Sequence, residues 1–95
     1  MPISTTPGKK IKDICAQLGD LYSIKVIDLE NCIYRKLNDE YDIEVSGLDN
    51  RKKGFSCTVY LWSIKAGNRI ESTYSDISSF GQLLETLQSL EMLYG

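Results

Sequence analysis

The chain has 95 residues, of which 42% are hydrophobic and 25% are charged, and 11 Lys and Arg against 13 Asp and Glu give a net charge of −2. This length supports one hydrophobic core and excludes two independent ones. The balance of apolar and charged residues is typical of a folded globular chain and excludes wholesale disorder. No apolar run approaches the ~20 residues that a membrane helix needs, and residues 1–10 contain no hydrophobic secretory segment. We therefore expect a cytoplasmic protein with no membrane partner.

The three cysteines, Cys15, Cys32 and Cys57, form no CxxC pair, and their odd number leaves at least one thiol unpaired. Each has apolar neighbours, so we predict reduced side chains that pack as small hydrophobic residues. A nucleophilic thiolate would need a base or a cation beside it to lower its pKa. The chain contains no histidine to act as that base.

Residues 1–8 hold both prolines and are expected to form a flexible N-terminal arm, followed by a single α+β domain over 9–95. From residue 9 the apolar residues recur at helical spacing, and Gly19 ends or frays this helix. The predicted apolar face of the helix consists of Ile11, Ile14, Cys15, Leu18 and either Leu21 or Tyr22.

The stretch 23–37 admits two interpretations. Its start alternates apolar and polar residues, as in a short strand, whereas Asp28 could cap a helix that runs through the rest of the stretch. The polar run 38–40 favours a hairpin, with 32–37 as its first strand and 41–45 as its second.

The middle of the chain has the pattern of an antiparallel meander. Segments 41–46, 55–64 and 69–74 are expected to be strands, because they alternate in polarity or are rich in aromatic and β-branched residues. A polar loop over 47–54 and a turn over 66–68 separate them. Strands joined by such short loops pair with their chain neighbours.

A C-terminal helix is predicted from Ser79 and Gln82, whose spacing is that of a capping box. Its apolar stripe is wide enough to cover a sheet and consists of Phe80, Leu83, Leu84, Leu87, Leu90 and Leu93. The fold class is therefore α+β. An antiparallel meander of three to four strands is flanked by the N-terminal helix and by the longer C-terminal helix packed on the sheet.

The residue types that are missing exclude most catalytic chemistry. Without histidine the chain has no Ser-His-Asp or Cys-His nucleophile and no zinc pattern, and the glycine-rich phosphate-binding motifs are absent. The acidic run Asp39, Glu40, Asp42 and Glu44 could hold Mg²⁺ or Ca²⁺. Alternation places the last two of these residues on the outer face of a strand, however, where we expect solvated carboxylates. We therefore predict no enzymatic activity, no cofactor and no metal site.

The strand over 55–64 is apolar on both sides. One side pairs with the leucine stripe of the C-terminal helix, and the other carries Tyr60 and Trp62. If helices cover only one face of the sheet, these aromatic side chains stand in solvent beside Asp42 and Glu44 and form a protein-binding surface. Alternatively, the first helix or the N-terminal arm covers this face, and Trp62 is a core residue.

These features predict a small regulatory or inhibitory protein that binds another protein, such as a nucleic-acid-handling complex. An acidic surface can occupy a basic groove on a partner and associate with it rapidly. In size, acidity and helix–sheet–helix outline the chain is similar to anti-CRISPR proteins as a class. This similarity is general and does not rest on a shared residue motif. The similarity implies that the chain is an inhibitor of this type, encoded by a phage or another mobile element.

The alternative function is a small nucleic-acid-binding module. Arg51, Lys52 and Lys53 at a hairpin tip would contact phosphates, while strand aromatics would stack on bases. In the protein-binding hypothesis the same three residues lie at the rim of the contact surface. The sequence allows either a monomer or a homodimer, because the leucine-rich C-terminal helix could pack across a two-fold axis.

Overall fold

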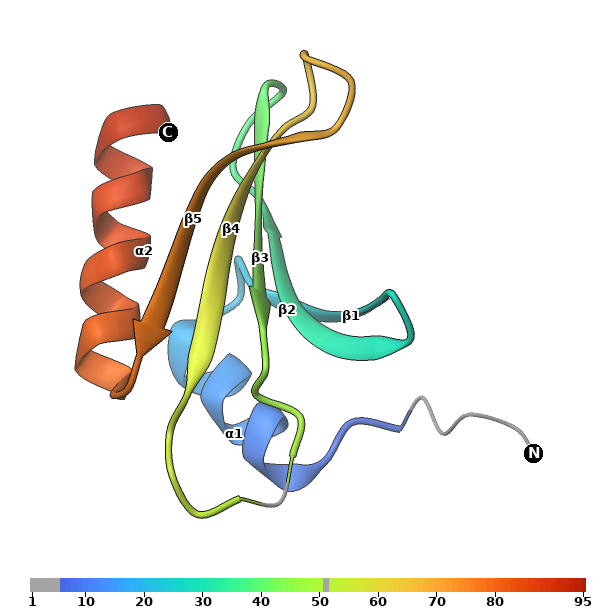
Figure 1. The fold of residues 1–95 in the computed structure, drawn as a ribbon, viewed down its shortest axis with the longest axis vertical. Helices are drawn as coiled ribbons and strands as arrows, with labels where there is room; N and C mark the ends of the chain where they lie inside the picture. Colours follow the sequence, from blue (N-terminus) through green and yellow to red (C-terminus); the bar gives the residue numbers. More distant parts are fainter. Residues whose placement is uncertain (1–5, 51) are drawn as a thin grey trace.

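The computed structural model describes residues 6–50 and 52–95. Two helices and five strands follow one another along this part of the chain (Figure 1). They are α1 (Lys9–Leu18), β1 (Ser23–Ile27), β2 (Glu30–Lys36), β3 (Tyr41–Ser46), β4 (Cys57–Ser63), β5 (Arg69–Ile77) and α2 (Phe80–Tyr94).

The strands form one antiparallel sheet in the order β1-β2-β3-β4-β5, so each strand pairs with its neighbour in the chain. This arrangement confirms the α+β class and the meander, but the sheet has five strands where three to four were predicted. The hairpin of β1 and β2 turns at Asp28 and Leu29, which have positive φ angles of 50° and 66°. A two-residue turn of this kind matches the twist of the paired strands. The alternative of a helix starting at Asp28 is therefore wrong.

The two helices begin and end near the predicted residues. Gly19 follows α1 with a φ of 103°, a value that glycine adopts without strain. At the start of α2, the Ser79 hydroxyl accepts a hydrogen bond from the backbone N–H of Gln82 at 3.1 Å. The Gln82 side chain reaches back to the backbone N–H of Ser78 at 2.7 Å, one residue before the position expected for a capping box.

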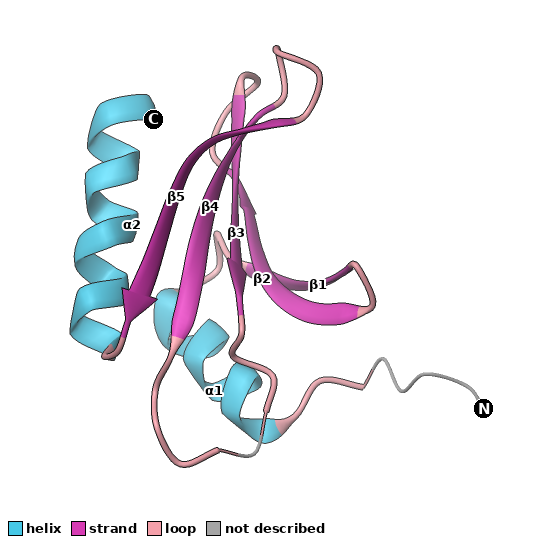
Figure 2. Cartoon of the chain, in the orientation of Figure 1, coloured by secondary structure: helices cyan, strands magenta, loops and turns pink. Residues whose placement is uncertain are grey.

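Both helices pack on the same face of the sheet (Figure 2). The core between them and the sheet contains residues of every strand except β1, and its buried members are Ile11, Ile14, Ile33, Ile43, Val45, Leu48, Cys57, Val59, Leu61, Ile77, Leu83, Leu87 and Leu90. The predicted stripe of α2 is too wide, because Leu93 is 73% exposed. Since α2 lies beside the edge strand β5, its outer side meets no further element of the described chain.

The opposite face of the sheet carries neither α1 nor α2. The interpretation in which the first helix covers this face is wrong, because Ile11 and Ile14 belong to the same core as the leucines of α2. The predicted arm over 1–8 lies mostly outside the described residues. Its last residue, Gly8, donates a backbone hydrogen bond to the Asp49 carboxylate at 3.0 Å.

Neither of the described helices combines the length and the apolar character that crossing a membrane requires.

Candidate binding surface on the open sheet face

The register of the sheet brings the four predicted site residues together. Asp42 lies directly opposite Trp62, and Glu44 lies directly opposite Tyr60, across the β3–β4 pair. All four point away from the helices, because their chain neighbours Ile43 and the other alternating residues fill the core. We call this side of the sheet the open face. It also includes Lys25, Cys32, Tyr34 and Ile70.

Two neighbouring hollows indent the open face. The first, of about 370 Å³, is named the lysine hollow and is lined in part by Lys25, Tyr34, Asp42, Glu44 and Trp62. The second, of about 260 Å³, is named the acidic hollow and is lined in part by Asp28, Glu30, Glu44, Tyr60, Trp62 and Ile70. Both linings include Ile27, Glu44 and Trp62, so these three residues lie between the two hollows.

Glu44 is nearly inaccessible, with only 7% of its surface exposed. Its Oε1 accepts a hydrogen bond from the Trp62 indole nitrogen at 3.0 Å, and its Oε2 accepts one from the Cys32 thiol at 3.7 Å. Burial raises the pKa of Glu44, and the nearby carboxylates of Asp28 and Glu30 raise it further, while the two hydrogen bonds act in the opposite direction.

The interpretation of Glu44 as a solvated carboxylate is therefore wrong. Strand alternation correctly places this side chain opposite the helices, but the β1–β2 hairpin curls across that side of the sheet (Figure 1). The curl brings Ile27 into the lining of both hollows beside Glu44. Because of this contact, a residue on the outer face of the strand is shielded from water.

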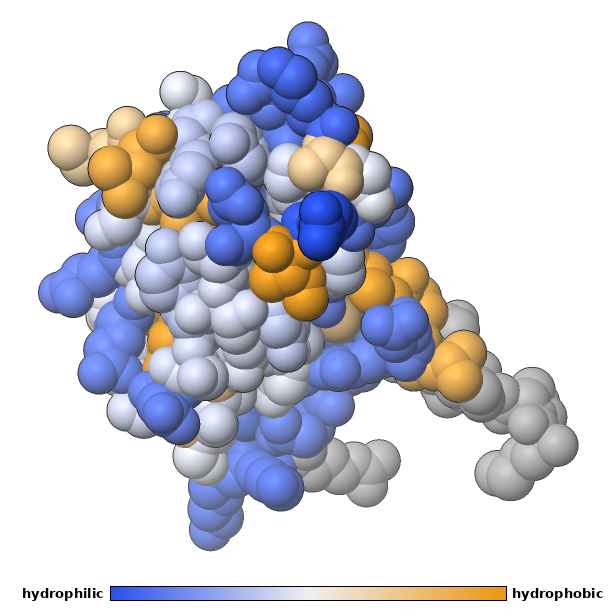
Figure 3. Space-filling model, turned by 45° about the horizontal axis from the view of Figure 1, so that its top comes forward, coloured by the Kyte–Doolittle hydropathy of each residue, from blue (hydrophilic) through white to orange (hydrophobic). Residues whose placement is uncertain are grey.

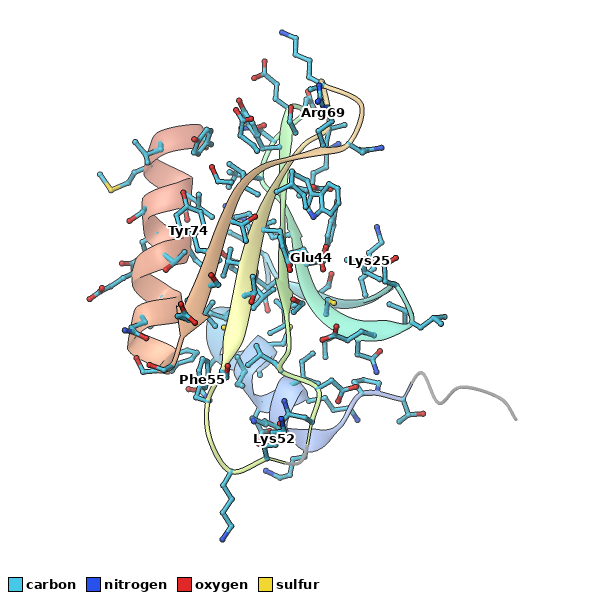
Figure 4. All side chains as sticks on the ribbon, in the orientation of Figure 1. Lys25, Glu44, Lys52, Phe55, Arg69 and Tyr74 are labelled. Atoms are coloured by element: carbon cyan, nitrogen blue, oxygen red, sulfur yellow. The ribbon has the colours of Figure 1, made fainter. Side chains whose placement is uncertain are left out.

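The lysine hollow holds a second set of internal contacts. The Tyr34 hydroxyl donates a hydrogen bond to Asp42 at 3.0 Å, and the Lys25 ammonium lies 4.4 Å from the centre of the Tyr34 ring. Burial, followed by the bond to Asp42, raises the pKa of Tyr34. Figure 4 shows Lys25 and Glu44 on the same side of the sheet. This hollow therefore already contains a cation that balances part of its negative charge.

Trp62 and Tyr60 are both half-buried. Trp62 is thus neither free in solvent nor a core residue, which places it between the two alternatives that the sequence left open. Its indole is fixed by the bond to Glu44, and it is the only tryptophan of the chain.

The cysteines have the packed environments that the sequence predicted, and all three are free. Burial raises the pKa of Cys32 to about 12 and that of Cys57 to about 11, and it also raises the pKa of Cys15. The Glu30 and Glu44 carboxylates add to the shift at Cys32. Within residues 6–50 and 52–95, the Cys, Asp and Glu side chains include no group of three or more positioned to hold a metal ion.

The predicted basic residues lie away from the hollows. Lys52 and Lys53 are exposed on the loop between β3 and β4, while Arg51 lies outside the described residues. This loop is fastened to α1, since the Lys10 ammonium donates hydrogen bonds to the carbonyls of Lys52 and Gly54 at 3.0 and 2.8 Å. Figure 4 shows Lys52 at the α1 end of the molecule, away from Glu44. The structure therefore does not bring these lysines to the aromatic side chains.

The contribution of the first hairpin to this surface is not among the features that the sequence predicted. Asp28 and Glu30 line the acidic hollow, and Lys25 lines its neighbour. The available signal was the alternation that begins at Ser23, which marks β1 as a strand. This signal becomes ambiguous at Asp28, because that residue also suits a helix N-cap.

Comparison of the chain with protein-family models, with curated proteins and with solved structures gives no match. The chemistry of the open face is therefore the basis for assigning a function.

Proposed function

We propose that this protein acts by binding another protein through its open face, in a regulatory or inhibitory role that involves no catalysis and no cofactor. The observation that carries the proposal is the position of Trp62 and Tyr60 on a sheet face that neither helix covers. Tryptophan and tyrosine are strongly enriched among the side chains that dominate binding energy at protein interfaces. Here they are held beside two hollows that a partner's side chains could enter.

The charge of the surface indicates the kind of partner. Four carboxylates line the two hollows, those of Asp28, Glu30, Asp42 and Glu44, against the single ammonium of Lys25 among the described lining residues. A basic surface on the partner complements this charge and speeds association. The same carboxylates repel phosphates, which argues against nucleic acid stacked on Tyr60 and Trp62.

The Trp62 side chain is pre-organised for binding. The bond from the Trp62 indole to Glu44 restricts the side chain before any partner arrives, so less conformational entropy is lost on association. Apolar contact is available as well, since Ile70 at the edge of the acidic hollow is 49% exposed. Figure 3 shows that apolar side chains reach the surface of the molecule in separate patches between hydrophilic ones.

The test compares three immobilised proteins against an extract of the source cells: the unmodified chain, Trp62→Ala, and Met92→Ala as the control. Met92 is 87% exposed on α2, on the far side of the core. A protein retained by the unmodified chain and by Met92→Ala, but lost with Trp62→Ala, is purified and its affinity measured. We expect Trp62→Ala to weaken binding by about 2 kcal/mol or more, roughly thirtyfold, with an unchanged circular dichroism spectrum.

Two outcomes would contradict the proposal. One is capture that is equal for folded Trp62→Ala and for the unmodified chain. The other is retention of the purified chain on a nucleic-acid column at low salt that falls steeply at moderate salt and is lost in Lys52→Ala/Lys53→Ala, since this supports the nucleic-acid alternative. If Trp62→Ala unfolds, Trp62→Phe removes the indole N–H and part of the contact area with less loss of packing, and it replaces the first variant.

A further inference from the structure

We infer that the acidic hollow receives an arginine side chain of the protein partner, stacked against Trp62 and Tyr60. This inference rests on the proposed function and specifies the chemistry of the contact. Three carboxylates, two aromatic rings and an exposed isoleucine from the β1–β2 turn and strands β2 to β5 meet in this hollow: Asp28, Glu30, Glu44, Tyr60, Trp62 and Ile70.

The described lining of the acidic hollow contains carboxylates but no lysine or arginine. The neighbouring lysine hollow differs, because Lys25 lies over the Tyr34 ring there and lines the hollow together with Asp42. Within the acidic hollow, Glu30 accepts a hydrogen bond from the Gly47 backbone at 2.6 Å, but this bond adds no positive charge. A cation that enters the hollow relieves the repulsion among the carboxylates.

The arrangement of the carboxylates suits an extended organic cation and not a metal ion. Among the described residues, no three such side chains converge as a metal site requires. Instead, Asp28 lies in the β1–β2 turn, Glu30 begins β2, and Glu44 lies within β3. A volume of about 260 Å³ also exceeds the need of a single ion. A larger cation, whose charge is spread over several atoms, can contact carboxylates that are separated from one another.

Arginine fits these walls better than lysine. Its planar guanidinium stacks on aromatic rings and carries several N–H donors, which can reach different carboxylates at once. Its aliphatic stem can pack on an apolar side chain such as Ile70 while the charged end enters the hollow. A lysine ammonium offers a compact charge that stacks less well.

One arginine of the chain itself makes the same combination of contacts at another place in the fold. The Arg35 guanidinium lies 5.4 Å from the centre of the Tyr22 ring and 3.1 Å from Oε2 of Glu91. An arginine is thus held between a tyrosine ring and a glutamate carboxylate. In the acidic hollow the ring and the carboxylates are present, and the arginine has to come from outside.

The inference is tested by titrating the labelled protein with N-acetylarginine methylamide and following its amide and indole resonances by nuclear magnetic resonance. The neutral citrulline counterpart and the lysine counterpart are titrated in parallel. We expect the arginine compound to shift the Trp62 indole N–H and the amides near Asp28 and Tyr60 saturably, in the millimolar range. The citrulline compound should bind at least about fivefold more weakly, and the lysine compound about two- to threefold more weakly.

A matched pair of variants locates the contact. Asp28 and Asp76 are both exposed and have similar positive φ angles of 50° and 62°, but Asp76 lines neither hollow. Asparagine tolerates this backbone conformation, so Asp28→Asn and Asp76→Asn remove the same charge with the fold preserved. We expect Asp28→Asn to weaken binding of the arginine compound about three- to fivefold and Asp76→Asn to leave it unchanged.

Equal binding of the arginine and citrulline compounds, or equal effects of the two asparagine variants, would overturn the inference. So would an indole resonance that does not move at saturating arginine compound. If partner capture still depends on Trp62 in that case, the proposed function stands and only the arginine contact is wrong. Partner capture that is equal for Trp62→Ala and for the unmodified chain overturns the proposed function itself. The two failures are therefore distinguishable.

Discussion

The indole nitrogen of Trp62 on β4 donates a hydrogen bond to the Glu44 carboxylate on β3, at 3.0 Å, across a surface that the helices leave open. The carboxylate is 7% exposed, and its other oxygen accepts from the Cys32 thiol. The most prominent aromatic side chain of the open face is therefore positioned by a buried acid. Since Trp62 is the only tryptophan, tryptophan fluorescence reports on the surroundings of this side chain, which include the contact with Glu44.

The first prediction is that Trp62 fluorescence follows the ionisation of Glu44. Burial raises the pKa of Glu44 above the ordinary value of 4.5, so the carboxylate takes up a proton before exposed glutamates do as the pH falls. A protonated carboxyl accepts the indole hydrogen bond less strongly. We expect an emission change with a midpoint above 4.5, absent in Glu44→Gln and retained in Glu85→Gln, which alters an exposed acid on α2.

The same group affects stability with a definite sign. Because the pKa of Glu44 is higher in the folded than in the unfolded state, the folded state binds more protons between the two values. The contribution of Glu44 to the free energy of unfolding therefore falls as the pH rises from 4.5 through the folded pKa. Glu44→Gln removes this fall. We therefore expect the free energy of unfolding, measured with urea, to decrease less or increase more with pH in the variant than in the unmodified chain over this window. Identical pH profiles would contradict the prediction.

The second prediction concerns the order in which the cysteines react. Cys32 and Cys57 are buried and have pKa values raised to about 12 and about 11, whereas Cys15 is only half-buried. The thiolate is the reactive form, so at pH 8 iodoacetamide should alkylate Cys15 first. Peptide mass spectrometry of samples labelled with and without guanidinium checks this. Rapid labelling of Cys32 in the native protein would show that the contact with Glu44 opens readily.

Periodicity predicted most of the fold because it reports on each segment by itself. The alternation over 41–46 and 55–64 identified β3 and β4, and through them the pairing that joins Asp42, Trp62 and Glu44. Periodicity does not show how far a strand pair bends over the rest of the sheet. Burial of Glu44 depends on the β1–β2 hairpin, and a strand pattern shows only which face a residue occupies and not whether water reaches it.

The first hairpin was hard to identify because its turn has an unusual residue. Turns with two positive φ angles favour asparagine, aspartate and glycine. Asp28 fits this preference, but Leu29, with a φ of 66°, does not. Leu29 therefore does not fit the pattern of a two-residue turn. Asp28 also suits a helix N-cap, so the sequence leaves a helical alternative open beside the favoured hairpin. The same local conflict has a measurable energetic consequence.

The third prediction is that Leu29→Gly stabilises the protein. The left-handed conformation costs a residue with a side chain roughly 1–2 kcal/mol, and glycine avoids most of this cost. Leu29 is 72% exposed, so little packing is lost. After allowance for the greater freedom of glycine in the unfolded chain, we expect the free energy of unfolding to rise by about 0.5–1 kcal/mol. Gly67→Ala, at a φ of 83° in the turn before β5, should have the opposite sign. Destabilisation by Leu29→Gly would show that the leucine contributes contacts that outweigh its strain.

The fourth prediction separates the two sides of α2. Leu87 is 3% exposed in the core, whereas Leu93 is 73% exposed, although both belong to the stripe predicted from the sequence. Leu87→Ala leaves a cavity and should lower the free energy of unfolding by about 2–5 kcal/mol, while Leu93→Ala should change it by no more than about 0.5 kcal/mol. Urea unfolding of both variants at the same protein concentration provides the comparison.

Repeating these measurements over a range of concentrations also tests whether the chain forms a homodimer. In a monomer the unfolding midpoint does not depend on protein concentration, and Leu93→Ala has little effect on the free energy of unfolding at any concentration. If two copies pack through the exposed end of α2, where Met92 and Leu93 lie, the midpoint rises with concentration because association stabilises only the folded state. The cost of Leu93→Ala then grows with concentration while that of Leu87→Ala does not. A large, concentration-independent cost at Leu93 would contradict its exposed position on the helix.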